Sequence, residues 1–251
     1  MIETTKRQAA GNTEVAAGVY RFGTRRVNWY LVAADGRLTI VDAGLPGHWQ
    51  QLLDGLDDLG YGLEDVEALV LTHGHSDHIG FAEQLHEAVA VPVLVHEADA
   101  ALVDGTDDGS ASEVMRNLWR PAILRLVFEF ARSGGFSVPP VEVIEPFEDS
   151  AVLDVPGTPQ VIHLPGHSAG SCALYLPERE VLLCGDALVT LDIKTGRAGG
   201  PQIMSMFNAD EERAVESLDR IESLGQVTLL PGHGDPWRGE IREAVQLARG
   251  Q

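Results

Sequence analysis

Residues 72–80 constrain this chain more than any other part of its sequence. They read Thr-His-Gly-His-Ser-Asp-His-Ile-Gly and place three histidines and one aspartate within six residues. An apolar run, residues 68–71, precedes them, and a segment with helical spacing, residues 81–88, follows them. We therefore expect these side chains to lie at the carboxyl end of a buried strand, the end at which α/β sheets collect ligands.

The spacing within this segment favours a metal site over a polar turn. His73, His75 and Asp77 stand at i, i+2 and i+4, and in an extended backbone such side chains point the same way. If a helix begins near Asp77, His78 is turned by about 100° and faces a neighbouring ion. A turn capped by Asp77 would explain a single histidine, whereas this dense group indicates metal ligands.

Short apolar segments alternate with turns along the rest of the chain. The predicted strands are residues 15–22, 27–33, 38–41, 66–71, 93–95, 141–144, 151–153, 161–164, 172–176, 181–184 and 227–230. The predicted helices are residues 49–59, 81–88, 97–103, 209–224 and 241–247. This order predicts one domain of two similar halves over residues 15–251, preceded by a flexible tail, residues 1–14.

One long apolar segment does not follow this alternation of strands and helices. Residues 105–136 begin and end in glycine-rich turns, and Pro121 should divide their helical part into two helices that meet at Arg120. Such a segment serves either as ordinary core or as a helical cap over a substrate pocket. We expect a cap insert over the active site and keep the core interpretation open.

Composition excludes several partners. The net charge is -20 with only two lysines, so the long-range field repels phosphates, and we expect neither nucleic acid nor membrane as a partner. Residues 1–14 contain no apolar stretch typical of a secretory signal, and the longest apolar run, residues 88–95, is too short to span a bilayer. We expect a cytoplasmic enzyme with a small-molecule substrate, as a monomer or a homodimer.

The acidic, lysine-poor composition also suits a salt-rich cytoplasm, although a genome rich in G and C would produce a similar bias. We hypothesise that the composition is a halophilic adaptation, because salt screens the repulsion among surface carboxylates. Thermal unfolding should then shift to higher temperature in molar potassium chloride. Equal midpoints in dilute and concentrated salt would contradict the hypothesis.

Two cysteines, Cys172 and Cys184, lie in strand-like runs on either side of a turn at residues 177–179. If that turn is centred near Glu178, the two cysteines face each other on paired strands. The geometry then permits a disulfide, but we expect two buried free thiols, as is usual in a reducing compartment.

Three further segments carry ligand-type residues beside glycines at predicted strand ends. They are Leu-Pro-Gly-His-Ser-Ala-Gly-Ser with His167, Cys-Gly-Asp-Ala-Leu with Asp186, and Leu-Pro-Gly-His-Gly-Asp-Pro with His233. With His-Gly-His-Ser-Asp-His and the Val-Asp-Ala-Gly of residues 41–44, this ordered set resembles the metallo-β-lactamase-fold hydrolase superfamily, in particular its glyoxalase II-like and lactonase-like branch. The resemblance covers nearly the whole chain from about residue 15, and it is specific for fold and metal site rather than for substrate.

The resemblance implies an α+β fold, a four-layer αβ/βα sandwich, with two metal ions at its edge. By the family pattern, the first metal is held by His73, His75 and His167, the second by Asp77, His78 and His233, and Asp186 bridges both. Imidazole and carboxylate ligands suit zinc, and iron or manganese also accepts them, so we expect two Zn²⁺ ions. Asp42 fits better as a residue that orients a ligand histidine than as a ligand.

Such a site activates water. Two cations close together lower the pKa of a shared water, and the hydroxide attacks a carbonyl or phosphoryl centre. Asp77 is the expected catalytic residue, because a ligand carboxylate can also orient the nucleophile or accept its proton. Ser168 and Ser171 are interpreted as loop hydrogen-bonding residues, His96 and His163 as structural histidines, and His48 and His86 as residues on helix surfaces.

The expected reaction is hydrolysis of a small ester, thioester or lactone. Asp186 corresponds to a bridging aspartate that true β-lactamases of the family lack, so β-lactam hydrolysis is kept as a second hypothesis, as a main or side activity. The third hypothesis is a phosphodiesterase or nuclease with the same two metals. The fourth is a persulfide dioxygenase with a single iron.

Overall fold

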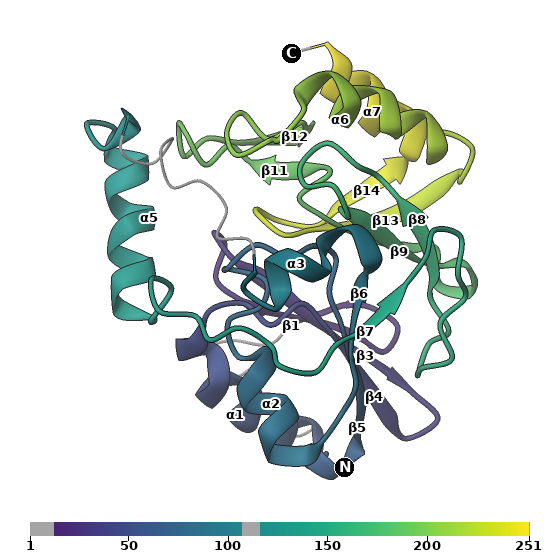
Figure 1. Ribbon diagram of the computed structural model, residues 1–251. Coiled ribbons are helices and arrows are strands. Elements are labelled where there is room, and N and C mark those ends of the chain that lie inside the picture. Colours follow the sequence, from purple (N-terminus) through teal and green to yellow (C-terminus); the bar gives the residue numbers. More distant parts are fainter. Residues whose placement is uncertain (1–12, 107–115, 251) are drawn as a thin grey trace, which may run out of the picture.

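Two mixed β-sheets form the centre of the fold (Figure 1). The structure is a computed structural model that describes residues 13–106 and 116–250. The first sheet has seven strands in chain order, and they are β1 Thr13–Ala16, β2 Val19–Gly23, β3 Asn28–Ala34, β4 Arg37–Val41, β5 Val66–Val70, β6 Val93–His96 and β7 Glu145–Phe147. Neighbouring strands are antiparallel from β1 to β4 and parallel from β4 to β7.

The second sheet has five strands in the order β14-β13-β10-β9-β8. They are β8 Gln160–His163, β9 Cys172–Leu176, β10 Val181–Gly185, β13 Gln226–Pro231 and β14 Trp237–Glu240. β10 and β13 are parallel, and the other neighbours are antiparallel. A separate hairpin pairs β11 Val189–Leu191 with β12 Ala198–Gln202.

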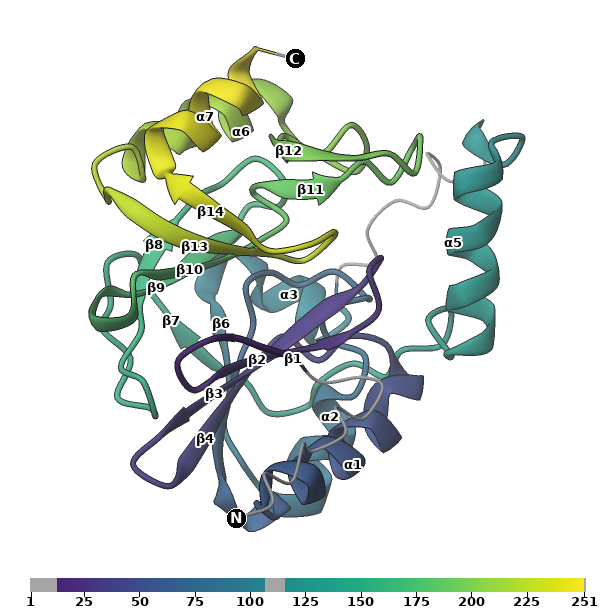
Figure 2. The ribbon, with the colours of Figure 1, turned by 180° about the vertical axis from the view of Figure 1, so that it is seen from behind.

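Helices cover the outer face of each sheet. The α-helices are α1 Trp49–Leu59, α2 Ala82–Val89, α3 Ala100–Val103, α5 Pro121–Arg132, α6 Glu211–Ser217 and α7 Ile241–Arg249. The short 3-10 helices are η1 Pro46–His48, η2 Leu63–Asp65, η3 Glu97–Asp99, η4 Pro177–Arg179 and η5 Leu218–Arg220. In Figures 1 and 2, α1 and α2 lie against the first sheet, and α6 and α7 lie against the second on the opposite side of the molecule. No helix among the described residues is long and apolar enough to cross a membrane.

The strands alternate their side chains between two apolar cores. In β5, Leu69 packs toward α1 and α2, whereas Val70 packs between the sheets. In β10, Leu183 packs between the sheets, and Leu182 packs toward α6 and α7. Because a strand with two buried faces needs apolar residues at every position, these strands read as continuous apolar runs. The predicted α+β class and the four-layer αβ/βα sandwich are confirmed.

Several element boundaries differ from the prediction. The strand predicted over residues 15–22 is a hairpin of β1 and β2, because Gly18 adopts a positive φ of 65° and turns the chain. The strand predicted over residues 141–144 lies later, as β7, an edge strand that tolerates Pro146. Residues 151–153 form only an isolated bridge, between Val152 and Gln160. The helix predicted over residues 209–224 is shorter and consists of α6 followed by η5. The strands β11, β12 and β14 were not predicted.

The predicted tail, residues 1–14, and the predicted cap, residues 105–136, each lie partly outside the described residues. Of the tail, only Thr13 and Glu14 are described, and both belong to β1. Of the segment 105–136, α5 begins at Pro121 after an extended Arg120, so the helix breaks at the predicted position. The helix predicted before Arg120 lies partly in the undescribed residues 107–115. α5 buries Ile123 and Leu126 against β11, Ile193 and two methionines, and it stands apart from the two sheets (Figure 2).

The cysteines face opposite sides of the second sheet. The register pairs Leu174 with Leu183, which offsets Cys172 from Cys184 by one residue. Cys172 therefore packs between the sheets and Cys184 packs toward the outer helices, and both are buried free thiols. Of the two interpretations, the free thiols are correct.

Candidate metal centre

The seven predicted ligands come together where the parallel strands of both sheets end. His73, His75, Asp77 and His78 follow β5, Asp186 follows β10, and His233 follows β13. His167 follows β8, which neighbours the same strands through β9. Since the carboxyl ends of parallel strands share one edge, the two sheets present these loops to each other.

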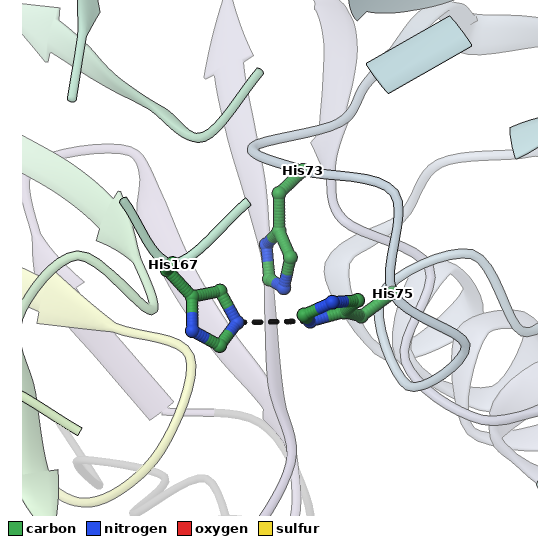
Figure 3. A group of neighbouring side chains, drawn as sticks. All are labelled: His73, His75 and His167. Atoms are coloured by element: carbon green, nitrogen blue, oxygen red, sulfur yellow. Dashed lines mark hydrogen bonds between the residues drawn. The ribbon is translucent and has the colours of Figure 1, made fainter. Parts of the chain in front are cut away.

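Three overlapping groups of side chains bring ligand atoms within 4.8 Å of one another. The groups are His73, His75 and His167; His73, His78 and Asp186; and Asp77, His78 and His233. Figure 3 shows the first group, in which the rings of His73 and His75, from the loop after β5, point toward His167 from the other sheet. All seven predicted ligands belong to at least one group.

The Asp186 carboxylate lies between the histidines of both sheets. Oδ2 is 2.9 Å from His233 Nε2 and 3.4 Å from His167 Nε2, whereas Oδ1 is 3.5 Å from His78 Nε2. His73 Nε2 lies 3.9 Å from Oδ2. One carboxylate therefore reaches imidazoles in each of the three groups.

The unsatisfied atoms of this cluster fit bound cations. His73 Nε2, His78 Nε2 and Asp186 Oδ1 are buried and have no hydrogen-bond partner among the described residues. Buried polar atoms without partners are costly, and bound cations would satisfy them. His75 Nδ1 and His167 Nε2 face each other at 2.9 Å, so both nitrogens can bind the same cation in the tautomers in which neither carries a proton. The donor set and its geometry thus suit metal binding.

Burial and charge divide the histidines into two classes. Burial lowers the pKa of His73 and His75, and it lowers the pKa of His167 to about 4, so these rings are neutral and offer lone pairs. For His78, burial opposes protonation, but the carboxylates of Asp42, Asp186 and Asp77 outweigh it and raise the pKa to about 10. Asp186 likewise raises the pKa of His233 against the effect of burial. The carboxylates around His78 and His233 therefore form an anionic environment that attracts cations.

Asp42 touches a candidate ligand, as expected from its position at the end of β4. Its Oδ2 accepts from His78 Nδ1 at 2.8 Å, and Oδ1 accepts from the Thr72 amide at 2.8 Å. The contact fixes the tautomer of His78 with Nε2 directed into the cluster. Asp42 adopts φ 61°, a conformation that side chains rarely take, and these hydrogen bonds hold it there.

Asp99 was missed by sequence reasoning, although it joins two ligand loops. It is fully buried and accepts three hydrogen bonds, from Gly74 N at 2.9 Å, Ser168 Oγ at 2.6 Å and Gly170 N at 2.6 Å. Gly74 lies between His73 and His75, and Ser168 follows His167. The available signal was its place just after β6, whose carboxyl end lies at the same sheet edge.

The His233 loop is held from the first sheet. Asn28 Nδ2 donates to Pro231 O and Gly234 O, both at 2.8 Å, and the Arg26 carbonyl accepts from His233 Nδ1. A Cβ at position 232 would collide with Asp186 Oδ1 and the His78 ring, so glycine is required there. The turn between β2 and β3 thus positions a ligand supplied by the second sheet.

The remaining polar residues occupy different places. No helix begins near Asp77, because residues 76–81 form turns in which His78 N donates to His75 O; the helix predicted over residues 81–88 is confirmed as α2, which begins at Ala82. His48 is buried rather than on a helix surface, and its Nδ1 accepts from Leu45 N at 3.2 Å. Ser171 Oγ is buried and lacks a hydrogen-bond partner in the described chain, so the expected hydrogen-bonding role holds only for Ser168.

The other histidines lie away from the cluster. His96 and His163 stack on each other with ring centroids 4.1 Å apart, and His163 Nε2 bonds Ala169 O at 2.8 Å. His86 is partly buried on α2 and bonds Val91 O at 2.8 Å. These contacts are structural and leave the seven clustered residues as the candidate ligands.

The comparisons with known proteins agree with this arrangement. A family model described as the metallo-beta-lactamase superfamily matches residues 22–233. The chain is 29% identical to the probable metallo-hydrolase YflN of Bacillus subtilis strain 168, over 94% of this chain and 91% of that protein.

Solved structures show the same likeness. The metallo-beta-lactamase family protein TTHA1429 from Thermus thermophilus is 25% identical with a TM-score of 0.67, over 93% of this chain and 79% of that chain. TTHA1623, solved in a di-iron-bound form, is 27% identical with a TM-score of 0.64, over 92% of this chain and 98% of that chain. The residues matched by the family model include all seven candidate ligands.

Proposed function

Because the chain belongs to the metallo-beta-lactamase superfamily and is a metallo-hydrolase, we propose that it hydrolyses small carboxylic esters, thioesters or lactones at a dinuclear metal centre. The observation that carries the dinuclear part is the Asp186 carboxylate, whose two oxygens reach His167 and His78 at 3.4 and 3.5 Å. We assign His73, His75 and His167 to one metal, Asp77, His78 and His233 to the other, and Asp186 to both.

Zinc is the metal we propose, with iron as the second candidate. Imidazole nitrogens and carboxylate oxygens are ligands that both metals accept. The di-iron form of the relative TTHA1623 keeps iron in consideration. When bound, such ions acidify a water molecule into a nucleophile and polarise the carbonyl under attack.

The protein's own residues direct the reaction around the ions. Asp77 is only partly buried, and its Oδ2 lies 3.6 Å from His233 Nε2, so this carboxylate stands at the accessible side of the cluster. We assign Asp77 Oδ2 the role of holding the proton that the attacking water releases. The acyl carbon gains the water oxygen, the bond to the alkoxide or thiolate breaks, and the leaving group takes up a proton.

Three features favour a carboxylic ester or thioester as the substrate. The net charge of -20 disfavours polyanionic nucleic acids. By resemblance, Asp186 matches the bridging aspartate of the family, which its true β-lactamases lack. This residue therefore favours the ester and thioester branch. The apolar surface of α5 near the β2–β3 turn suits a substrate with a lipophilic part.

Metal analysis combined with a substrate panel tests this function. We expect about two equivalents of zinc per chain, and hydrolysis of a thioester or lactone that a chelator abolishes and Zn²⁺ restores. The panel includes a β-lactam, a phosphodiester and a persulfide with oxygen consumption recorded. Faster turnover of any of these three, or activity that survives complete metal removal, would contradict the proposal.

A further inference from the structure

A basic and apolar segment stands out in this acidic chain. Residues 116–136 carry four arginines and one glutamate, whereas the whole chain has 38 acidic and 18 basic residues. Large apolar side chains of this segment are also exposed to solvent: Leu124 is 51% exposed and Phe128 is 63% exposed. Both lie on α5, which stands beside the sandwich (Figure 1). Exposed apolar residues among cations are typical of a binding surface.

These residues line a groove between α5 and the β2–β3 turn. The groove has a volume of about 410 Å³, and Leu124, Arg125, Phe128, Arg132 and Arg26 are among its lining residues. A second cavity, of about 100 Å³, continues toward the β11–β12 hairpin and shares Arg26 and Arg125. Arg125 therefore faces both cavities.

Arginines outnumber carboxylates along the groove and the smaller cavity, where the charged lining residues are Arg25, Arg26, Arg125, Arg132, Glu129 and Asp192. Arg26 pairs with Glu129 at 3.0 Å, and Arg25, at the smaller cavity, pairs with Asp235 at 2.7 Å. Arg125 and Arg132 have no carboxylate partner within 4.0 Å among the described residues, and Arg132 instead lies over the Phe128 ring at 5.8 Å. Two guanidinium groups thus remain available to an anion within one partly apolar groove.

Backbone contacts link the groove to the loop that carries His233. The Arg26 side chain lines the groove while its carbonyl accepts from His233 Nδ1. The neighbouring Arg25 carbonyl accepts from Gly234 N at 2.9 Å. Leu191 lines the smaller cavity next to Thr190, whose amide donates to the His233 carbonyl at 3.0 Å. The groove is therefore built directly on the loop that supplies a candidate ligand.

Resting on the proposed hydrolase function, we propose that the substrate carries an anionic group that binds Arg125 and Arg132. A carboxylate or a phosphate has the required chemistry, since either accepts paired hydrogen bonds from guanidinium groups. The apolar part of the substrate packs against Leu124 and Phe128. This subsite selects anionic ester or thioester substrates over neutral ones.

A matched set of thioesters tests the proposal. The hexanoyl thioesters of 3-mercaptopropionate, 2-mercaptoethyl phosphate and 2-mercaptoethanol present a carboxylate, a phosphate and a neutral group. We expect the R125Q/R132Q double variant to lose about tenfold or more in kcat/KM for an anionic thioester, mainly through KM, because charged hydrogen bonds are lost. The neutral thioester should react at the wild-type rate. The anionic thioester with the higher kcat/KM shows whether the subsite prefers a carboxylate or a phosphate.

A control variant and a binding measurement separate the possible outcomes. R213Q/R242Q removes two exposed arginines from α6 and α7 and should match wild type with every thioester. Calorimetric titration of metal-free protein with octanoate and octyl phosphate measures the subsite without hydrolysis. Binding that requires Arg125 and Arg132 supports the subsite, whether or not the thioesters are hydrolysed. The absence of thioester hydrolysis would refute only the proposed function. Equal loss for neutral and anionic thioesters, or binding unchanged in R125Q/R132Q, would overturn the proposal.

Discussion

Replacement of Asp186 by Ala is expected to abolish hydrolysis and to reduce the bound metal. The carboxylate contacts His233, His167 and His78 within 3.5 Å, so its removal deprives both proposed metal positions of one ligand. Loss of an outer contact to a ligand typically costs 10- to 100-fold, and loss of a shared ligand should lower turnover by more than about 100-fold. Turnover of a thioester and metal content per chain measure the two effects.

A nearby aspartate provides the control for this variant. Asp235 lies two residues from His233, but its half-exposed carboxylate pairs with Arg21 and Arg25 at the surface. Exposed pairs contribute little, so Asp235→Ala should keep both metals and most of the activity. His75→Ala should behave like Asp186→Ala. Full activity and two bound metals in both His75→Ala and Asp186→Ala would refute the ligand assignment.

Asp99→Ala is expected to lower both stability and metal affinity. The substitution leaves three buried donors, Gly74 N, Ser168 Oγ and Gly170 N, without their acceptor. Unsatisfied buried donors cost about 1–3 kcal/mol each, so the free energy of unfolding should fall by about 3 kcal/mol or more. Because the same contacts join the His73–His75 loop to the His167 loop, metal affinity should fall by about 10- to 100-fold.

Chelator competition at a temperature where the variant is folded separates positioning from stability. Ser168→Ala removes one of the three hydrogen bonds and should show a smaller loss of affinity. Asp104→Ala removes an exposed carboxylate beyond α3 that bonds Thr106 and should bind metal normally. If Asp99→Ala unfolds more readily but binds metal as tightly as wild type, Asp99 has only a structural role.

Local patterns predicted the elements that pack within one half of the chain. α1 lies at the predicted residues, because Leu52 and Leu56 repeat at helical spacing and Gly60 ends the helix with φ 79°. The predictions failed where contacts with another part of the chain determine the structure of a segment. The β1–β2 hairpin depends on the Gly18 turn, and β14 depends on pairing with β13. His48 was assigned to the surface because its burial depends on contacts from outside its own helix.

The sequence by itself determined the chemical types of the candidate ligands and their places at strand ends. Histidines and carboxylates beside glycines are visible in one dimension, and strand ends share an edge whenever strands run parallel. Only the tertiary structure decided which ends meet: β5 belongs to one sheet and β10 and β13 to the other, so Asp186 reaches His78 through packing between the sheets. The Asp99 contacts and the arginine groove arise in the same way, since hydrogen bonds and unbalanced charges depend on distances between residues remote in the chain.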